Sequence, residues 1–178
     1  HFVLSSGLHS SKYIQCAKLL SHPYIAKDIC ISLSKRIKKK YKKIDLILSP
    51  AIGGIVIGYE IGRLLKKETI FCERDKGKFK LRRGFFIKKK SKVLIVEDVI
   101  TTGKSSLESA KLIKKAGATL LGFACIIDRS NKKNLKIKKK IISHMKIEVP
   151  VYKKNKIPLT LKAIPISKPG SRYLRWRD

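Results

Sequence analysis

The chain has 178 residues, enough for one compact domain with a hydrophobic core. No apolar run approaches the roughly 20 residues that cross a membrane, and no signal peptide is recognisable, so we expect a cytoplasmic protein without a membrane partner. Its 43 Lys and Arg residues against 12 Asp and Glu residues give a net charge of +31, spread over nearly every predicted connection and helix end. This spread predicts attraction of polyanionic ligands and no specific nucleic-acid partner.

The first residue and the cysteines add two expectations. The chain begins at His1, directly before the apolar residues Phe2–Leu4, so we expect the natural N-terminus to lie further upstream. The cysteines are far apart, without a C-x-x-C pair and without a histidine at ligand spacing. We interpret them as reduced, mostly buried thiols with no metal or disulfide role, namely Cys16, Cys30, Cys72 and Cys125.

The first elements predicted along the chain are a short strand and a long helix. Phe2–Leu4 forms the strand, and Ser5–Gly7 ends it in a turn that is either a plain turn or the lining of a pocket. Pro23 favours a helix start, because its missing N–H is not needed there. Apolar residues then recur three and four positions apart, which predicts one buried stripe made of Ile25, Ala26, Ile29, Cys30, Leu33 and Ile37.

The next unit is a buried strand, a glycine loop and a helix. Ile44–Ser49 is an apolar run typical of a strand in a parallel sheet, and Ile55–Leu65 has helical spacing. A glycine loop alone is a weak indication of a pyrophosphate-binding site. A parallel sheet would, however, bring this loop to the same edge as the acidic motif described below, which strengthens the indication. The loop residues whose backbone amides can hold a pyrophosphate are Ala51, Ile52, Gly53 and Gly54.

A third strand, Thr69–Glu73, leads into the basic segment Arg74–Gly84, which lacks apolar periodicity. We predict that this segment is a mobile loop that closes over a pyrophosphate leaving group and neutralises its developing charge. The alternative is a solvated β-hairpin with a basic tip, in which Phe85–Ile87 is the returning strand.

The central motif is Val93–Ser105, which reads V-L-I-V-E-D-V-I-T-T-G-K-S. Its four apolar residues predict a buried strand that ends abruptly at Glu97 and Asp98. The hydroxyl-rich turn Thr101–Ser105 then opens a helix. Unpaired amides at a helix start, with Gly103 allowing close approach, predict a phosphate cradle.

Paired carboxylates directly before a phosphate-binding turn would repel the anion unless hydroxyls or a cation lay between them. A sugar phosphate with Mg²⁺ meets this condition, because Glu97 and Asp98 can take ribose hydroxyls and the waters of the metal while the turn takes the phosphate. The alternative is a buried strand that runs into a capped helix. A Walker P-loop is excluded, since no G-x-x-x-x-G-K-[ST] string occurs.

The pattern after the motif predicts a helix over Ser105–Ala116, ended by Gly117, and a core strand over Thr119–Ile127. Arg129 follows that strand at the same sheet edge, where it can bind an anionic group of a second substrate in bidentate fashion. An ion pair with Asp128, or a plain surface arginine, is the alternative.

The last part of the chain is predicted to contain little regular structure. The Lys-rich sequence from Asn131 is typical of a loop, and Met145–Tyr152 is a possible edge strand, since Pro150 excludes a central position. The prolines from Pro158 onward predict short extended pieces and no further helix.

Taken in order, these motifs resemble the type I phosphoribosyltransferases, whose signature is similar to the Val93–Ser105 motif. Further strings narrow the resemblance to the orotate phosphoribosyltransferases over nearly the whole chain. They are S-S-G-L-H-S at Ser5–Ser10, Y-I-Q-C-A at Tyr13–Ala17, S-P-A-I-G-G-I-V-I-G-Y-E at Ser49–Glu60, E-R-D-K-G-K-F-K-L-R-R-G-F at Glu73–Phe85, I-D-R-S at Ile127–Ser130 and K-P-G-S-R at Lys168–Arg172.

The resemblance implies an α/β protein with the type I phosphoribosyltransferase fold, a central, mainly parallel sheet flanked by helices. Residues 1–178 would form a single domain, in which a core of about 21–149 carries a small hood built from about 1–20 and 150–178. The resemblance also implies a homodimer whose basic loop reaches into the neighbouring subunit's site.

The implied reaction transfers the phosphoribosyl group of 5-phosphoribosyl 1-diphosphate to orotate, giving orotidine 5′-monophosphate and diphosphate in pyrimidine (UMP) synthesis. Mg²⁺ would be carried by the substrate, with Glu97 and Asp98 nearby and no direct protein ligand. Orotate would contact Thr101 and Arg129. The phosphoribosyl substrate would contact the loop of Ala51, Ile52, Gly53 and Gly54, the basic residues Arg74 and Lys78, and the run of Glu97, Asp98, Val99, Ile100, Thr101, Thr102, Gly103, Lys104 and Ser105.

Three of these residues, Lys78, Arg74 and Asp98, are implied to act in catalysis. Orotate can attack as an anion, so we expect an oxocarbenium-like transition state that is stabilised by positioning and charge compensation. The chain departs from better-known members at Ser5, where they have a lysine, and at Asp75, where they have a second basic residue. The alternatives are a purine phosphoribosyltransferase and a phosphoribosyl-pyrophosphate-sensing nucleic-acid regulator, although no DNA-reading helix is recognisable.

Overall fold

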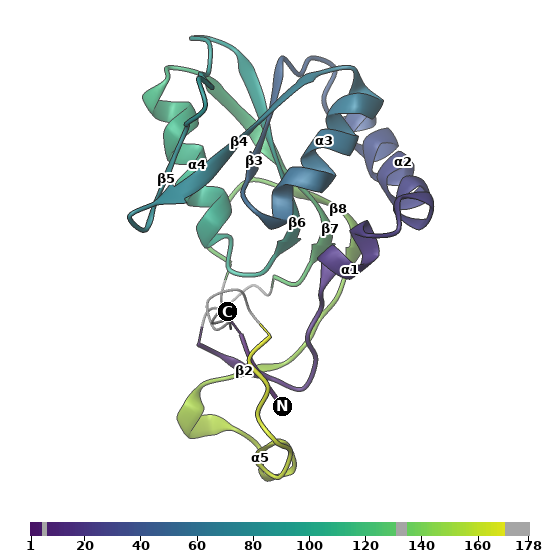
Figure 1. The fold of residues 1–178 in the computed structure, drawn as a ribbon, viewed down its shortest axis with the longest axis vertical. Helices are drawn as coiled ribbons and strands as arrows, with labels where there is room; N and C mark the ends of the chain where they lie inside the picture. Colours follow the sequence, from purple (N-terminus) through teal and green to yellow (C-terminus); the bar gives the residue numbers. More distant parts are fainter. Residues whose placement is uncertain (5–6, 131–134, 170–178) are drawn as a thin grey trace, which may run out of the picture. The chain divides into compact units, whose positions relative to one another are not determined.

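A computed structural model describes residues 1–4, 7–130 and 135–169 (Figure 1). The chain divides into two compact units, which we name the core unit, Cys16–Ile147, and the terminal unit, His1–Gln15 with Glu148–Asp178. Each unit has its own sheet. The single domain with a hood of about 1–20 and 150–178 remains a prediction.

The core unit is built on a six-stranded sheet in the order β5-β4-β3-β6-β7-β8, in which β5 is antiparallel to β4 and every other neighbouring pair is parallel. The central strands are apolar runs, because strands that are covered on both faces need no polar alternation. The predicted α/β fold with a mainly parallel sheet is confirmed. The strands are β3 (Leu46–Pro50), β4 (Glu68–Asp75), β5 (Lys78–Lys80), β6 (Lys92–Ile100), β7 (Thr119–Asp128) and β8 (Ile141–Lys146).

Helices cover both faces of this sheet (Figure 1). Three of them contact one another on one face, namely α1 (Cys16–Leu20), α2 (Pro23–Lys40) and α3 (Gly53–Leu65). On the other face, α4 (Lys104–Lys115) packs against β6 and β7, where Ile113 is buried in a cluster with alternate residues of the strands. The short α1 was not predicted, since five residues carry too few turns for a periodic signal.

The predicted stripe of α2 is largely confirmed. Ala26, Cys30, Leu33 and Ile37 are buried, whereas Ile25 is exposed. Positions 25 and 29 lie at the margin of the stripe formed by positions 26, 30, 33 and 37, and Ile29 is half-buried. The helix begins at Pro23, as predicted, and ends in three lysines that suit the negative end of its dipole.

The terminal unit contains a small antiparallel sheet in the order β1-β2-β9, formed by Phe2–Val3, His9–Ser10 and Val151–Tyr152. A 3₁₀ turn, η1 (Lys154–Lys156), and a short helix, α5 (Leu159–Lys162), follow. Inside this unit the rings of His1 and His9 approach each other, with Nε2 of His1 2.6 Å from Nδ1 of His9. The predicted absence of a further helix after Pro158 is therefore wrong, because that proline precedes α5 and its carbonyl accepts bonds from the helix.

The prediction of one edge strand over Met145–Tyr152 is also wrong. The edge of the core sheet is β8, which ends at Lys146, and β9 belongs to the other sheet. Pro150 lies between the two strands, at a point where no ladder hydrogen bond is needed. The predicted turn residues Ser5 and Ser6, the Lys-rich start at residues 131–134 and the tail from Gly170 lie outside the described residues.

The described residues contain no helix that is long and apolar enough to cross a membrane. All four cysteines are buried, as predicted, and none forms a disulfide within the chain. Burial raises the pKa of the Cys16, Cys30 and Cys72 thiols, which keeps these groups neutral and supports a packing role.

Candidate functional site

The acidic pair lies inside a strand and does not end it. β6 continues to Ile100 because its pairing with β7 continues, with Glu97 opposite Cys125 and Ile100 opposite Asp128. The prediction that the strand stops at the carboxylates is wrong. Adjacent residues of a strand point to opposite faces, so Glu97 and Asp98 lie on different sides of the sheet.

Glu97 points to the face covered by α4. Its side chain is 7% exposed, and its carboxylate accepts a hydrogen bond from the hydroxyl of Ser106 in α4. Burial raises the pKa of the Glu97 carboxyl to about 7, while the hydrogen bond from Ser106 acts in the opposite direction. Direct contact between Glu97 and a ribose remains a prediction.

Asp98 points to the other face and lies directly over Gly53. A Cβ atom added to Gly53 would be only 2.6 Å from Oδ2 of Asp98, and the Oδ1 atom accepts a bond of 2.9 Å from the Val99 amide. Burial raises the pKa of the Asp98 carboxyl. The structure therefore brings together the carboxylate of one predicted motif and the glycine loop of the other.

The glycine loop Ala51–Gly54 is held against the sheet edge. The Ala51 amide donates to the Cys72 carbonyl at 2.7 Å, and the Ala51–Ile52 peptide bond is cis. A Cβ atom at Gly54 would be 3.2 Å from the Val96 carbonyl, so the loop passes close over β6. α3 begins at Gly53, two residues earlier than predicted, and its first amides lie at this edge.

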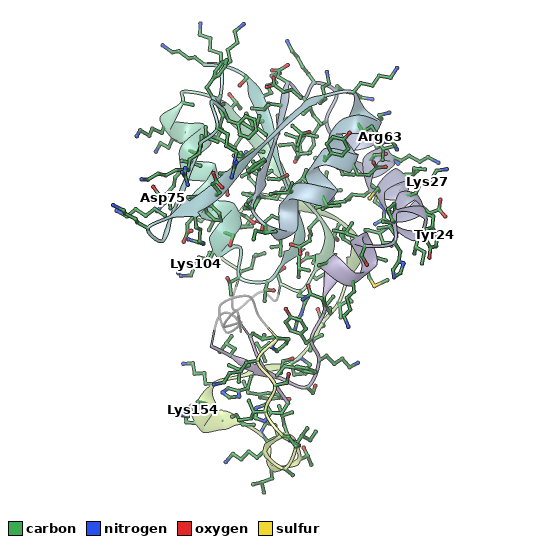
Figure 2. The ribbon with its side chains drawn as sticks, viewed as in Figure 1. Tyr24, Lys27, Arg63, Asp75, Lys104 and Lys154 are labelled. Carbon is green, nitrogen blue, oxygen red and sulfur yellow. The ribbon has the colours of Figure 1, made fainter. Side chains whose placement is uncertain are left out.

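The turn after β6, which we name the bend, is Thr101–Gly103. Gly103 has φ of +72°, and a Cβ atom added there would be 2.6 Å from two side-chain atoms of Ile137. The Lys136 amide donates to the Thr102 carbonyl at 3.3 Å. α4 then begins at Lys104, which is exposed (Figure 2). The first helical amides therefore follow directly on a bend that is packed from behind.

Arg129 directly follows β7 and is buried. Its backbone amide donates to the Ile100 carbonyl at 2.8 Å, so it lies beside the residue that precedes Thr101. The two residues predicted to contact orotate thus come from neighbouring strand ends. The Ser130 amide donates to Oδ1 of Asp128 at 2.8 Å.

The basic segment forms a β-hairpin. β4 continues to Asp75 and β5 begins at Lys78, with Asp75 opposite Lys78 in the register. The prediction of a loop without regular structure is wrong. The alternative of a β-hairpin with a basic tip is confirmed, although its returning strand is β5 and not Phe85–Ile87. Lys76 and Gly77 both have positive φ, which makes the two-residue turn that joins the strands.

The two predicted catalytic residues of this hairpin differ in their surroundings. Arg74 forms an ion pair of 2.7 Å with Glu108 of α4, donates to the Gly77 carbonyl at 2.8 Å and lies 4.2 Å from the centre of the Phe79 ring. Lys78 is exposed at the start of β5. Arg74 is thus held against α4, and its action on a diphosphate remains a prediction.

A family model described as a phosphoribosyl transferase domain matches residues 16–156. A protein of Parvibaculum lavamentivorans named orotate phosphoribosyltransferase is 45% identical over 175 residues, which cover 98% of this chain and 90% of the relative. A protein of Chlorobium phaeobacteroides with the same name is 46% identical over 174 residues, which cover 98% of this chain and 89% of the relative. The chain belongs to the orotate phosphoribosyltransferase family.

Solved structures agree with this family in fold. The orotate phosphoribosyltransferase of Aeropyrum pernix has a TM-score of 0.66 at 21% identity and covers 82% of this chain and 85% of its own. An adenine phosphoribosyltransferase from Thermoanaerobacter pseudethanolicus has the same TM-score at 18% identity. The match covers 76% of this chain and 88% of that protein's chain. At such identities the likeness shows the fold alone, and the predicted type I phosphoribosyltransferase fold is confirmed.

Sequence reasoning missed three residues that shape this orotate phosphoribosyltransferase site, namely Ser106, Glu108 and Ile137. For Ser106 a signal existed, since strand alternation places Glu97 on the same face as Val93 and Ile95, toward α4. For Ile137 no signal existed, because its contact with Gly103 spans more than thirty positions of sequence.

Proposed function

We propose that the chain transfers the phosphoribosyl group from 5-phosphoribosyl 1-diphosphate to orotate, giving orotidine 5′-monophosphate and diphosphate in pyrimidine nucleotide synthesis. The observation that carries the proposal is the approach of Asp98 to Gly53, because it joins a carboxylate suited to a sugar with a loop suited to a diphosphate. The names of the relatives that cover almost the whole chain support orotate as the acceptor.

In this reaction the bond from the anomeric carbon to the diphosphate oxygen breaks, and a bond from that carbon to N1 of orotate forms. Amides of the bend and of the first turn of α4 bind the 5′-phosphate, while Asp98 binds the ribose hydroxyls and the Ala51–Gly54 loop binds the diphosphate. Thr101 and Arg129 hold the acceptor, whose carboxylate suits a guanidinium group. Lys78 and Arg74 compensate the charge that develops on the leaving diphosphate.

The donor set of the site suits a Mg²⁺ ion that arrives with the substrate. Among the described residues no group of three or more His, Cys, Asp or Glu side chains could hold a metal ion. Mg²⁺ commonly keeps several waters and binds through one or two carboxylates plus substrate phosphates, and Asp98 lies where it can contact those waters. When bound, the ion would reduce the negative charge of the diphosphate group.

A turnover assay with 5-phosphoribosyl 1-diphosphate and Mg²⁺ tests the function. Orotate, adenine and hypoxanthine are offered as acceptors in parallel, and ultraviolet absorbance follows loss of the base. We expect turnover with orotate alone. Turnover with a purine instead would indicate a purine phosphoribosyltransferase. Binding of 5-phosphoribosyl 1-diphosphate without turnover on any base would favour the alternative of a nucleic-acid regulator that senses this compound.

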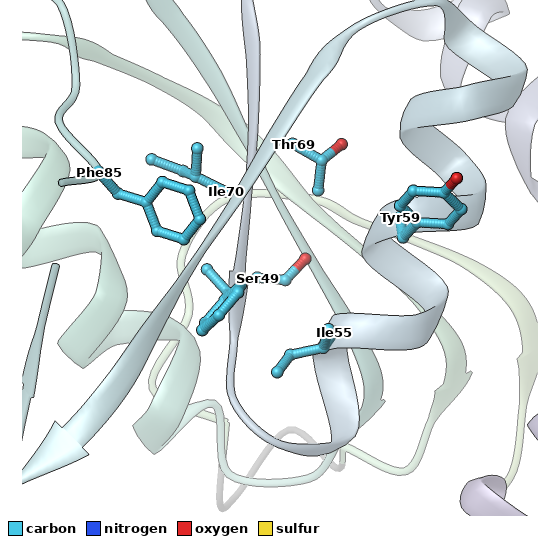
Figure 3. Close-up of a pocket in the computed structure, with 7 residues that line it drawn as sticks. Ser49, Ile55, Tyr59, Thr69, Ile70 and Phe85 are labelled. Atoms are coloured by element: carbon cyan, nitrogen blue, oxygen red, sulfur yellow. The ribbon is translucent and has the colours of Figure 1, made fainter. Parts of the chain in front are cut away.

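We further propose that the protein is a homodimer that associates through an exposed apolar face of α3. Ile52, directly before the helix, and Val56 and Tyr59 within it are 84%, 53% and 68% exposed. Tyr59 also lines a hollow of about 130 Å³ (Figure 3). Its lining residues are Ser49, Ile55, Tyr59, Thr69, Ile70, Phe71 and Phe85. Large exposed apolar patches commonly mark interaction sites.

Charge favours a second copy of this chain as the occupant of this face. Two copies that each carry +31 repel, so a surface without lysine is the favoured place for their association. α3 contains no lysine, and its Arg63 is paired with Glu60 at 2.7 Å. A cytoplasmic location also remains part of the proposal.

Light scattering coupled to gel filtration tests the dimer. We expect Val56→Lys to give monomers, because it places a charge in the apolar face. Tyr24→Lys is the control, since Tyr24 is an exposed large apolar residue on another helix, α2 (Figure 2), and this variant should leave the dimer intact. A dimeric Val56→Lys variant would contradict this assignment of the interface.

A further inference from the structure

The connections that lead into four parallel strands of the core unit carry runs of lysine. The neighbours β4, β3, β6 and β7 are parallel, so their starts meet at one edge of the sheet. In Figure 2 long side chains tipped with nitrogen extend from the end of the core unit that lies away from Lys104. We name this surface the basic edge. Its runs, in which every lysine is exposed, are Lys38–Lys43, Lys66–Lys67, Lys88–Lys92 and Lys114–Lys115.

Little negative charge offsets the basic edge. The acidic residues in these four connections are Asp45 and Glu68, and Oδ2 of Asp45 accepts a bond of 2.8 Å from the Lys92 amide. The ion pairs found among the described residues all involve basic side chains outside these runs. The acidic pair Glu97 and Asp98 lies toward the other end of β6. The core unit is therefore polarised, with its lysine-rich edge turned away from the site.

Helix dipoles explain only some of these lysines. Lys38–Lys40 and Lys114–Lys115 lie in the last turns of α2 and α4, where cations suit the negative end of a helix. Lys42, Lys43 and Lys88–Lys92 belong to no helix. Like charges gathered in this way repel one another and disfavour the compact state, so a polyanion that neutralises them is the complementary partner.

Backbone hydrogen bonds hold the runs side by side. The Lys90 amide donates to the Gly117 carbonyl at 3.0 Å, and the Asp45 amide donates to the Lys92 carbonyl at 2.9 Å. A Cβ atom added to Gly117 would be 3.3 Å from Cγ of Lys89, so the stem of this lysine lies along the end of α4. Neighbouring strands lie about 4.8 Å apart, so four strand starts present cations over roughly 15 Å. The basic edge is thus a preformed row of positive charge.

We propose that the basic edge binds the phosphate backbone of a nucleic-acid duplex, without reading its sequence and away from the phosphoribosyltransferase site. Each strand of a duplex presents a phosphate about every 3.4 Å, so an extended row of cations meets several phosphates at once. α2 and α4 end at this edge, so neither lies along it as a helix that could enter a groove. Phosphate contacts alone position a duplex and carry no sequence information.

The surroundings of the lysines favour a duplex over a single strand and over a lipid surface. The large apolar side chains that are exposed in the described residues all lie outside the runs, and the nearest in sequence is Phe86, two residues before Lys88. Tyr41, the aromatic residue inside a run, is half-buried, and its hydroxyl donates to the Leu121 carbonyl at 3.3 Å. Single strands stack on exposed aromatic rings, and membrane-binding surfaces insert apolar side chains. The basic edge offers neither.

Fluorescence anisotropy of a short labelled duplex titrated with the full chain tests the proposal. RNA and DNA duplexes should both bind, and two unrelated sequences of each should differ by less than about twofold, because only phosphates are contacted. One phosphate contact from each of the four connections predicts a slope of about −3.6 for the logarithm of the binding constant against that of the salt concentration. Affinity should therefore fall on the order of 100-fold between about 50 and 200 mM salt.

Charge reversal at the edge should remove this binding. The variant combines Lys43→Glu, Lys88→Glu and Lys115→Glu, one change in each of three neighbouring connections. The salt slope should lose about three units, and affinity should fall at least about tenfold. Turnover on orotate should stay at the wild-type rate, because these residues lie away from the site, and this activity also shows that the variant is folded.

The matched control changes the net charge equally at other places in the core unit. It combines Lys18→Glu, Lys27→Glu and Lys146→Glu, which are exposed lysines outside the runs. Lys27 lies roughly 16 Å of helix before Lys38, which exceeds the screening length of about 10 Å at 0.1 M salt. The control should therefore bind the duplex within about twofold of the wild type.

Three results would overturn the proposal. Equal losses in the two variants would mean that net charge alone attracts the duplex. Release of the duplex by saturating 5-phosphoribosyl 1-diphosphate would place it in the phosphoribosyltransferase site. Tighter binding to phosphatidylserine vesicles than to the duplex, lost in the edge variant, would assign the basic edge to a membrane surface. An edge variant that alone loses the duplex and keeps its turnover would confirm the basic edge as the binding surface.

Discussion

The bend and the β4–β5 hairpin are both predicted to bind phosphate groups, but they are held in place by different forces. The bend is packed by the buried Ile137 and bridged by the buried bond from Ser106 to Glu97. The hairpin packs one residue of β5, Phe79, into the core cluster, while the side chain of Arg74 is held on α4 by a partly exposed ion pair with Glu108, whose side chains are 32% and 26% exposed.

This difference separates a preformed part of the site from a movable one. Buried contacts are lost only at a cost of several kcal/mol, whereas exposed ion pairs contribute about 0–1 kcal/mol each. The bend can therefore present its amides without rearrangement, and the side chain of Arg74 can leave Glu108 at little cost while Phe79 keeps β5 in place. Four changes, taken from the largest expected effect to the smallest, test this contrast.

The largest effect is expected for Gly103→Val. A β-branched residue is strained at φ of +72°, and its Cβ would overlap Ile137, so we expect a loss of about 4 kcal/mol of stability or an equivalent displacement of the bend. Thermal denaturation measures the first outcome and donor binding measures the second.

Gly84→Ala is the control for Gly103→Val. Gly84 also has positive φ, but a Cβ atom there would meet nothing within 4 Å. Only the backbone strain remains, so the variant should lose about 1 kcal/mol and bind the donor normally. Equal losses in both variants would show that Ile137 does not hold the bend.

The second effect concerns Lys78 at the tip of the hairpin. Lys78→Ala should lower kcat on the order of 100-fold. The variant lacks a positive charge whose interaction with the leaving diphosphate forms only in the transition state. The KM for orotate should change little. Lys76→Ala removes a lysine from the turn that precedes β5 and should leave kcat near the wild-type value. Equal losses in kcat and in orotate binding would remove Lys78 from the chemistry.

The same contrast explains what could be predicted from the sequence. The strand, glycine and helix start of the bend are contiguous in the sequence, so a local motif predicts them, whereas the packing of Ile137 on Gly103 is not visible there. The hairpin depends on Lys80 and Phe79 pairing with Glu73 and Arg74, and nothing in the basic sequence distinguishes that pairing from a loop. The division of Glu97 and Asp98 between two faces depends on pairing with β7, which no local pattern contains.

The third effect is the pH dependence of stability that Glu97 contributes. Its pKa rises from about 4.5 to about 7 on folding, so between these values the folded chain holds a proton that the unfolded chain has released. The resulting stability is present below the unfolded pKa and is lost as the pH rises to about 7, by up to about 3 kcal/mol. Urea denaturation at pH 5 and pH 8 measures it.

Glu97→Gln does not titrate, so its stability relative to the wild type should increase from pH 5 to pH 8. The control is Glu60→Gln, because the hydrogen bond from Arg63 lowers the pKa of the Glu60 carboxyl and gives a small dependence of the opposite sign. If the wild type and Glu97→Gln keep the same difference in stability at both pH values, the Glu97 carboxyl does not bind a proton in this range.

The smallest effect is expected for Glu108→Gln, which weakens the ion pair between α4 and Arg74. Stability should change by less than about 1 kcal/mol, since both side chains are partly exposed. Because Arg74 must leave α4 before it can reach a diphosphate, kcat should stay equal or rise. Asp75→Asn is the control, since it weakens the pair with Lys80 inside the hairpin and leaves the tether to α4 intact. A tenfold fall in kcat for Glu108→Gln alone would mean that Arg74 acts from the position in which α4 holds it, and that the hairpin is as preformed as the bend.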